Sequence, residues 1–262
     1  MANIIRFGGG SGGKKDENLP ITRLTEGTII KINESGVPQD YYLAQIGYQP
    51  ELNQNRVLLV RKKCPKVGTW NDAGTNNYAG STIDTFFNSE MKAMYDANVR
   101  VAMGETVIPY TAGNGNTAVT TLSRSVFALS LTELGITYAY ANVEGEAVPI
   151  ASLLQTPTME DGSLDGQWVR SPNKNNSTQA LYVIAASGSV STFATTGSTG
   201  YRPCFTLPNT ATVLPEPNLD GSYTLAIDAE DVAMAAEASI MRLNNENGVY
   251  TEALNELGVE TE

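Results

Sequence analysis

The chain of 262 residues contains no histidine, and this restricts the chemistry that its side chains can perform. Ser-His-Asp and Cys-His nucleophiles, histidine-ligated zinc and histidine acid/base catalysis are all excluded. Two carboxylate pairs, Glu144 with Glu146 and Asp161 with Asp165, could act as the acid and base of a glycosidase at a suitable separation. Both pairs lie among glycines in loop-like sequence, where solvated acids are the usual outcome. We therefore expect no catalytic residue and no enzyme activity.

The two cysteines, Cys64 and Cys204, lie far apart and form no CxxC motif, so the sequence lacks redox and zinc-thiolate signatures. We expect both to be small buried hydrophobic residues. A disulfide and a copper-thiolate pair are the alternatives. No metal site and no cofactor is expected from either residue.

Two tripeptides match the calcium and sugar signatures of C-type lectins, in which oxygen atoms from both hold one Ca²⁺. They are "WND" at 70–72 and "EPN" at 216–218. In those lectins EPN comes first and WND follows closely, whereas this chain reverses the order and separates them widely. Turn chemistry explains both, because each precedes or contains a turn-forming Asn-Asp or Asp-Gly sequence. We therefore expect two turns and no calcium site.

The formal net charge of -11 and the pI near 4.5 constrain the partners. Such an acidic surface repels phosphate backbones and anionic lipids, so no nucleic-acid partner is expected. No apolar stretch is long enough to span a bilayer, and the apolar start of the chain is too short for a secretory signal. We expect a soluble protein, made in a bacterial cytoplasm, whose partners are proteins or neutral sugars.

The first third of the chain predicts an arm followed by strands. Residues 1–20 combine a short apolar start with the linker "GGGSGGKKDEN", which is typical of a flexible tether. The segments 27–33 and 39–48 flank the turn sequence "ESGVP" and predict a hairpin, and 55–64 supplies a third strand.

The middle of the chain predicts helix and loop. Ser81 begins the sequence "STID", in which an acid three residues after the serine is typical of a capping box. The segment 125–135 predicts a strand that leads into a helical turn capped by Ser130 or Thr132, and 104–121 reads as loop-rich. The helix after Ser81 has one apolar stripe at helical spacing: Ile83, Phe86, Phe87, Met91 and Met94.

The last part of the chain predicts strands and then a helical tail. The strands are expected in 167–172, in 180–192 with a turn at residues 187–189, and in 200–207. Residues 228–247 have acids in the first turn and one apolar face, which predicts an amphipathic helix, and 251–258 predicts a second, short helix.

Four of these segments, in this order and spacing, resemble a domain of unassigned function that is common in prophages and surface proteins of Firmicutes. The usual form has Tyr-x-x-Ser with a helix, then Val-Phe-Leu-Leu-Ser, Trp-Leu-Arg-Ser-Pro and Val-Arg-Pro-Ala. The resemblance covers about residues 27–207. The start "MANIIRFGGGSGG" also resembles tail-module proteins of such prophages. The segments are "YAGSTIDTFFNSEM", "SVFALSLTELG", "QWVRSP" and "GYRPCFTL".

That domain is similar to the C-type lectin fold of formylglycine-generating enzymes and phage adhesins. The resemblance implies an α+β fold with small twisted antiparallel sheets, two helices and long loops. The expected organisation is an attachment arm (1–20), a C-type lectin-like domain (21–210), a linker (211–227) and a helical tail (228–262). Those enzymes use two active-site cysteines that are close in sequence, and this chain has no such pair.

The resemblance also implies where a ligand would bind. In phage adhesins of this fold, the loops after the Trp-Arg strand and before the last Arg-containing strand form the receptor-binding face. Small polar side chains in such loops give adaptable hydrogen bonds. Trp168, Arg170 and Arg202 are expected to be structural, as a buried ring and as arginines that bond loop carbonyls. The expected ligand-binding residues are Asn173, Lys174, Asn175, Asn176, Thr192, Thr195 and Tyr201.

Three hypotheses about function follow. The first is a virion adhesion or fibre module that binds a host-surface carbohydrate or protein. The second is a purely structural virion component, such as a capsid decoration or tail-associated protein, and the third is an enzyme. In the first two, the arm would attach the chain to other virion proteins, and the chain would form a homo-oligomer without inserting into a membrane.

Overall fold

The computed structural model describes residues 17–49, 52, 55–163 and 165–227. Among these residues 41% lie in strands and 14% in helices, so the protein is mostly β. The expected α+β fold with a C-type lectin-like core is therefore wrong. The prediction failed because two segments whose composition is typical of irregular structure form strands.

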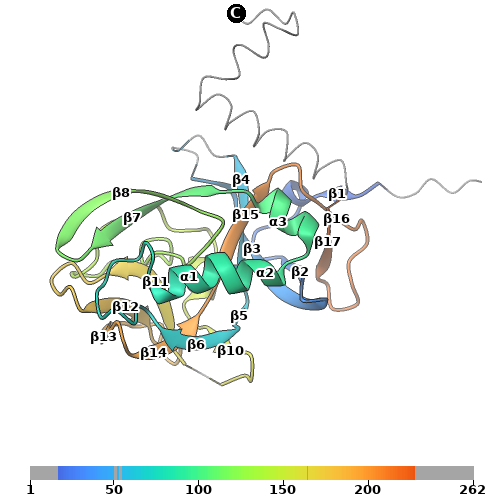
Figure 1. Ribbon diagram of the computed structural model, residues 1–262. Coiled ribbons are helices and arrows are strands. Elements are labelled where there is room, and N and C mark those ends of the chain that lie inside the picture. Colours follow the sequence, from blue (N-terminus) through green and yellow to red (C-terminus); the bar gives the residue numbers. More distant parts are fainter. Residues whose placement is uncertain (1–16, 50–51, 53–54, 164, 228–262) are drawn as a thin grey trace, which may run out of the picture.

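The larger sheet has eight strands and includes the first and the last strand of the described chain (Figure 1). Every neighbouring pair is antiparallel except one. In the order in which they are hydrogen-bonded, the strands are β1 (Leu19–Pro20), β16 (Thr212–Val213), β17 (Tyr223–Ala226), β2 (Ile29–Glu34), β3 (Val37–Tyr48), β4 (Arg56–Arg61), β15 (Cys204–Pro208) and β9 (Val126–Phe127).

The hairpin expected near the start of the chain is confirmed as β2 and β3. These strands are joined by Ser35 and Gly36, which both have positive φ angles, 51° and 79°, as a type I′ turn requires. Glycine adopts this conformation without steric cost, which explains why the "SG" sequence directs a tight turn here. The third expected strand is confirmed as β4, which pairs with β3.

Strand β4 is buried on both of its faces. Val57 and Leu59 belong to one apolar core, whereas Leu58 and Val60 belong to a second core on the other face of the sheet. Successive side chains of a strand point to opposite faces, so a strand between two cores must be apolar throughout. The continuous "VLLV" sequence of β4 is the result.

A second sheet has five strands, and the expected binding residues lie in these strands or in the loops that join them. Its strands pair antiparallel, apart from one parallel pair in the middle. The turn expected at residues 187–189 is confirmed between two of them, with Gly188 at a φ of 65°. In spatial order the strands are β13 (Val190–Ala194), β12 (Gln179–Val183), β11 (Gln167–Pro172), β14 (Ser198–Tyr201) and β6 (Lys66–Thr69).

Two further sheets have two strands each. In one, β5 (Lys63–Cys64) pairs parallel with β10 (Thr158–Met159). In the other, β7 (Thr106–Gly113) and β8 (Asn116–Arg124) form an antiparallel hairpin, so the expectation of a loop-rich segment over 104–121 is wrong. The hairpin turn is Asn114–Gly115, with φ angles of 49° and 86°. Asn-Gly is the favoured type I′ turn sequence, and it directs a hairpin here although the surrounding glycine and threonine are typical of loops.

The expected linker over 211–227 is also structured. It contains β16 and β17, and β17 pairs parallel with β2 in the larger sheet. At the other end of the chain, β1 pairs with β16, so the last residues of the expected arm belong to the same sheet. Residues 1–16 of the arm and the expected helical tail, 228–262, lie outside the described residues.

The helix expected after Ser81 is confirmed. It begins as α1 (Thr82–Phe86), continues through a π-helical turn η3 (Phe87–Met91) and ends as α2 (Lys92–Met94), in one stretch that lies across the sheets (Figure 1). The Ser81 side chain accepts a hydrogen bond from the main-chain N of Asp84, as the capping box predicts. The apolar stripe is buried except for its last residue, Met94, which is 36% exposed.

Three shorter helical segments complete the described chain: η1 (Ile21–Arg23), α3 (Ala97–Met103) and α4 (Ala151–Leu154). The helical turn expected near Ser130 is also present. The Ser130 hydroxyl accepts from the main-chain N of Glu133, and the Glu133 carboxylate accepts from the main-chain N of Ser130. Gly135 ends this turn with a φ of 69°. Among the described residues, no helix is long and apolar enough to cross a membrane.

Candidate functional site

The loop between β11 and β12, residues 173–178, is called the polar loop below, and it is held by the side chain of Asn76. Asn76 lies between β6 and α1 and is 1% exposed. Its Nδ2 donates toward the main-chain carbonyl oxygens of Asn173, Asn176 and Gln179, at 2.9, 3.0 and 2.9 Å. Because these bonds are sheltered from water, they fix the path of the polar loop.

Asn76 also fixes the tip of the β7–β8 hairpin. Its Oδ1 accepts a hydrogen bond of 2.6 Å from the main-chain N of Asn114. Gly113 packs so closely that a Cβ atom there would lie 2.0 Å from the carbonyl oxygen of Asn76, and its φ of 76° also favours glycine. The main-chain N of Asn76 donates to Ser177 O at 2.8 Å. Three segments distant in sequence therefore meet at one asparagine.

The polar loop presents small neutral side chains to solvent. Asn175, Asn176, Ser177 and Thr178 are exposed, and Lys174 is half-buried. The Asn176 side chain is itself ordered, because its Oδ1 accepts from the main-chain N and the hydroxyl of Thr178 at 3.0 and 2.9 Å. The result is a polar surface whose main chain is rigidly placed and whose side chains remain accessible.

Three of the seven expected ligand-binding residues are buried, and their assignment is corrected here. Asn173 is 5% exposed and bonds within the loop and to Gln179. Thr195 is fully buried. Tyr201 is 1% exposed, and its hydroxyl donates to the main-chain carbonyl oxygen of Thr69. None of these side chains can reach a ligand at the surface, because each faces the interior of the second sheet or of the loop.

The remaining four expected residues, Lys174, Asn175, Asn176 and Thr192, are at least partly accessible. Only the first three lie together in the polar loop. Thr192 lies on β13, three residues before Thr195, whose main-chain N bonds Thr178 O. Three residues of a strand correspond to about 10 Å. The structure thus does not bring Thr192 into the polar loop.

Phe193, an aromatic side chain that the sequence did not single out, follows Thr192 on β13. Phe193 is 39% exposed and stacks on Trp168, with ring centroids 5.9 Å apart and an interplanar angle of 23°. It also packs over Gly197, where an added Cβ would be 2.4 Å from the ring. The ring is therefore held in place against Trp168 and Tyr182, with part of its surface exposed.

The three residues expected to be structural are buried. The Trp168 Nε1 donates to Gly68 O at 2.9 Å. Arg202 donates to the main-chain carbonyls of Arg61, Lys62 and Leu154 at 2.7 to 3.1 Å. These positions support the framework below the polar loop rather than its surface.

Arg170 forms a fully buried ion pair with Glu133. The Arg170 Nη1 and Nη2 donate to the two Glu133 oxygens at 2.6 and 2.8 Å, and both side chains are 0% exposed. Tyr48 Oη and Gln49 Nε2 donate to the same carboxylate. Burial lowers the pKa of Arg170, but the charge and hydrogen bonds of Glu133, together with Tyr48 and Glu144, outweigh burial, so the pKa is raised and Arg170 stays protonated.

The carboxylate pairs that could have served a glycosidase are used in other ways. Glu144 is fully buried, accepts from Thr111 N at 2.5 Å and also accepts from Ser171 Oγ, whereas Glu146 is exposed. Burial raises the pKa of Glu144. Asp165 accepts from the main-chain N of Gly166 and the hydroxyl of Thr199. The first pair therefore has only one accessible carboxylate, whereas in the second pair Asp161 is exposed, Asp165 is half-buried and both accept main-chain hydrogen bonds.

Comparison with known protein families matches residues 54–209, more than half of the chain, to a domain of unknown function (DUF6273). The chain belongs to the DUF6273 family. No curated protein and no solved structure matches it. The DUF6273 segment contains Asn76, the polar loop, Phe193 and the whole β7–β8 hairpin, so the entire candidate site lies within the family domain.

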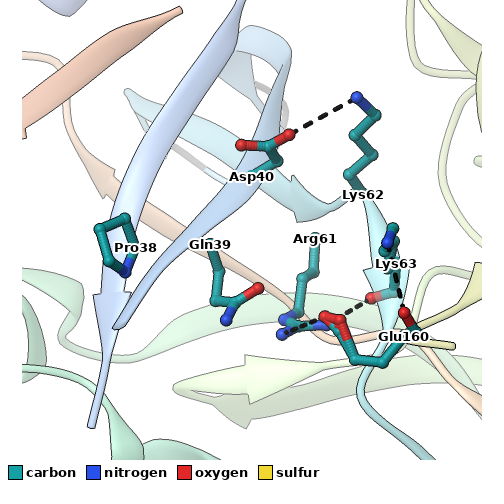
Figure 2. A pocket seen from close by; sticks show the side chains of 7 residues that line it. All are labelled: Pro38, Gln39, Asp40, Arg61, Lys62, Lys63 and Glu160. Carbon is teal, nitrogen blue, oxygen red and sulfur yellow. Dashed lines mark hydrogen bonds and ion pairs between the residues drawn. The ribbon is translucent and has the colours of Figure 1, made fainter. Parts of the chain in front are cut away.

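A charged pocket of about 180 Å³ lies where the DUF6273 segment meets β3 (Figure 2). Arg61 forms its floor and is 3% exposed. Its Nε donates to Glu34 Oε1 at 2.7 Å, and its Nη2 lies 3.0 Å from Glu160 Oε1. The lining residues are Pro38, Gln39, Asp40, Arg61, Lys62, Lys63 and Glu160.

The charges of this pocket compensate one another. Lys62 Nζ lies 3.5 Å from Asp40 Oδ2, and Lys63 Nζ donates to Glu160 O at 3.3 Å (Figure 2). Burial lowers the pKa of Arg61, but the hydrogen bond and charge of Glu34, together with Tyr41 and Glu160, outweigh burial, so this pKa is raised. Both acids that line the pocket, Asp40 and Glu160, are thus paired with cations, and we take the polar loop as the candidate site of the DUF6273 domain.

The two lectin-like tripeptides form turns, as expected. Gly74 N donates to Asn71 O at 3.1 Å, and Gly221 N donates to Asn218 O at 2.9 Å. The Asp72 carboxylate accepts from the Thr69 hydroxyl. Within the part of the chain that the structure describes, no group of three or more His, Cys, Asp and Glu residues could hold a metal ion.

The two cysteines are free and buried, as predicted. Burial raises the pKa of Cys64 to about 12. Burial also raises the pKa of Cys204, whose Sγ donates to Phe127 O at 3.0 Å. Both thiols are therefore protonated at neutral pH and act as core residues of the DUF6273 domain.

Proposed function

We propose that the chain is an adhesion module of a virion, and that its polar loop binds a neutral carbohydrate on the host surface. The observation that carries the binding part is the polar loop, whose main chain is fixed by Asn76 while Asn175, Asn176, Ser177 and Thr178 remain exposed. A preorganised loop loses little conformational entropy on binding, which favours recognition. The sequence resemblance to a prophage domain supports the virion part.

The chemistry of the polar loop favours a neutral, hydroxyl-rich ligand. Asn175 and Asn176 supply amide donors and acceptors, and Ser177 supplies a hydroxyl, so sugar hydroxyls would find partners of both kinds. The net charge of -11 disfavours phosphate-rich ligands.

We prefer binding over catalysis because two buried acids that bond side chains of β11, Glu133 and Glu144, cannot reach a substrate. Glu133 and Glu144 are both 0% exposed and bonded to several groups. A general acid or base has to come within hydrogen-bond reach of its substrate. The exposed side chains of the polar loop are amides and hydroxyls, which bind sugars without hydrolysing them.

The test is an array of neutral oligosaccharides, probed with the full chain and with a variant in which Asn175, Asn176 and Ser177 are all replaced by alanine. We expect the parent to bind a defined set of glycans and the triple variant to lose tenfold or more in affinity, equivalent to about 1.4 kcal/mol. Its free energy of unfolding should fall by less than about 2 kcal/mol, because exposed substitutions cost within about 0.5 kcal/mol each and Asn176 also loses its bonds to Thr178.

The matched control replaces Thr25 and Ser152, two exposed residues outside the polar loop, by alanine. This variant should bind like the parent. If the parent binds no glycan and no host cell, the adhesion proposal fails, and the structural role in the virion becomes the better explanation. If the triple variant binds like the parent, binding lies elsewhere on the chain.

A further inference from the structure

Strand β8 forms an open edge of the molecule (Figure 1). It pairs only with β7 among the described strands, and its first six residues, 116–121, are all exposed. Val119 is 44% exposed. A long exposed edge strand has unpaired main-chain donors and acceptors and is a template for another strand.

The backbone groups on this open edge can be identified from β7. Pro109 O and Thr111 N form hydrogen bonds of 2.9 and 2.5 Å with side chains from β11 and from the loop before α4, away from β8. In an antiparallel pair, two directly opposed residues either bond each other or both direct their main-chain N–H and C=O groups away from the partner strand. The partners of Pro109 and Thr111 are Thr121 and Val119, so the amides and carbonyls of both point to the open edge.

The edge is neutral on a strongly acidic protein. Residues 116–123 contain no charged side chain, whereas the whole chain carries -11. Arg124, at the end of β8, is neutralised by Asp84, with Nε and Oδ1 2.7 Å apart. Two copies of an acidic protein repel each other, and residues 116–123 add no charge of their own to that repulsion.

We propose that β8 pairs antiparallel with β8 of a second copy of the chain, about a two-fold axis near Thr121. The outward backbone groups of Val119 and Thr121 would then bond the same strand of the partner copy. Threonine and valine favour strands, and joining two hairpins gives a four-stranded sheet, which is more stable than an isolated two-stranded one. Small neutral side chains impose no charge clash in this arrangement and offer no feature that selects a different protein.

The test measures the mass of the full chain by sedimentation over a concentration series. We expect a shift from one copy to two as the concentration rises. Thr121→Lys and Thr121→Glu should each weaken self-association at least about tenfold, because two like charges meet near the axis. An equimolar mixture of the two variants should restore association, because opposite charges then face each other.

Thr25→Lys, at an exposed threonine away from β8, is the matched control and should associate like the parent. Circular dichroism and thermal unfolding check that each variant is folded. Should the Thr121 variants unfold, the double variants Val119→Lys with Ser123→Lys and Val119→Glu with Ser123→Glu repeat the test, because Val119 faces Ser123 of the second copy about this axis. A parent that stays monomeric, variants that associate like the parent, or a mixture that associates no better than its components would each overturn the proposal.

Discussion

Replacing Asn76 by aspartate isolates the contribution of one side chain to the candidate site. The change keeps the size and shape of the side chain but removes the Nδ2 donors. Those donors point at the carbonyl oxygens of Asn173, Asn176 and Gln179, all within 3.0 Å. In the variant, an oxygen of the carboxylate faces three carbonyl oxygens in a buried position.

The expected loss of stability follows from the number of donors. The amide has two hydrogens, so at most two strong bonds are lost, each with a net contribution of about 0.5–1.5 kcal/mol. Leaving a buried acceptor without a partner adds about 1–3 kcal/mol. We therefore expect a decrease of about 3 kcal/mol in the free energy of unfolding, and a Tm lower by about 6–12 °C for a domain of this size. Typical domain stabilities of about 5–15 kcal/mol mean that Asn76→Asp still folds.

The assay combines urea denaturation with hydrogen exchange of main-chain amides. Exchange should become faster in the polar loop and at the tip of the β7–β8 hairpin, because Asn76 Oδ1 also accepts from Asn114 N. Strand β4, in the middle of the larger sheet, should keep its protection. Asn175→Asp is the control, because this exposed residue adds the same charge to the loop without losing a described side-chain bond.

Two results would refute this reasoning. One is an Asn76→Asp variant whose stability lies within about 0.5 kcal/mol of the parent, which is the effect expected of an ordinary surface substitution. The other is faster exchange spread evenly over the chain, which would mean that Asn76 stabilises the whole fold rather than the three segments that meet at it.

Three further predictions concern the interior. Because burial raises the pKa of Glu144, its ionised form lowers the free energy of unfolding at high pH. Glu144→Gln should therefore be more stable than the parent at pH 8. Denaturation at a series of pH values should show this difference shrinking as the pH falls through the raised pKa. An advantage that grows on acidification would contradict the assignment. Cys64 and Cys204 should resist alkylation by iodoacetamide in the native protein and react after denaturation, as mass spectrometry would detect; rapid native labelling would show that they are accessible. Trp168→Ala should cost about 3–5 kcal/mol in chemical denaturation through a core cavity, and a loss below about 1 kcal/mol would place the ring outside the core.

Local signals in the sequence predicted several elements well. The Ser81 and Ser130 caps and the "SG" turn between β2 and β3 depend on a few neighbouring residues, and the structure contains all three. The β7–β8 hairpin was missed because threonine, glycine and asparagine are common in both loops and exposed strands. The Asn114–Gly115 pair carried the signal that could have found it.

The fold and the site depended on contacts that the sequence does not display. The strands β16 and β17 are only two and four residues long, and pairing with each other and with β1 and β2 makes them part of the sheet. In the polar loop, the buried Asn173 and the exposed Asn175 have the same side chain. Which of them is accessible is decided by Asn76, almost a hundred positions earlier, and no local pattern relates them.

The Asn76 side chain bonds main-chain carbonyls, which every amino acid has. The frame of the polar loop therefore does not depend on which side chains occupy its exposed positions, 175, 177 and 178. Random substitution at these positions should yield a library in which most members keep the parent's backbone. The loop is thus a natural place to graft new recognition specificities onto an unchanged scaffold.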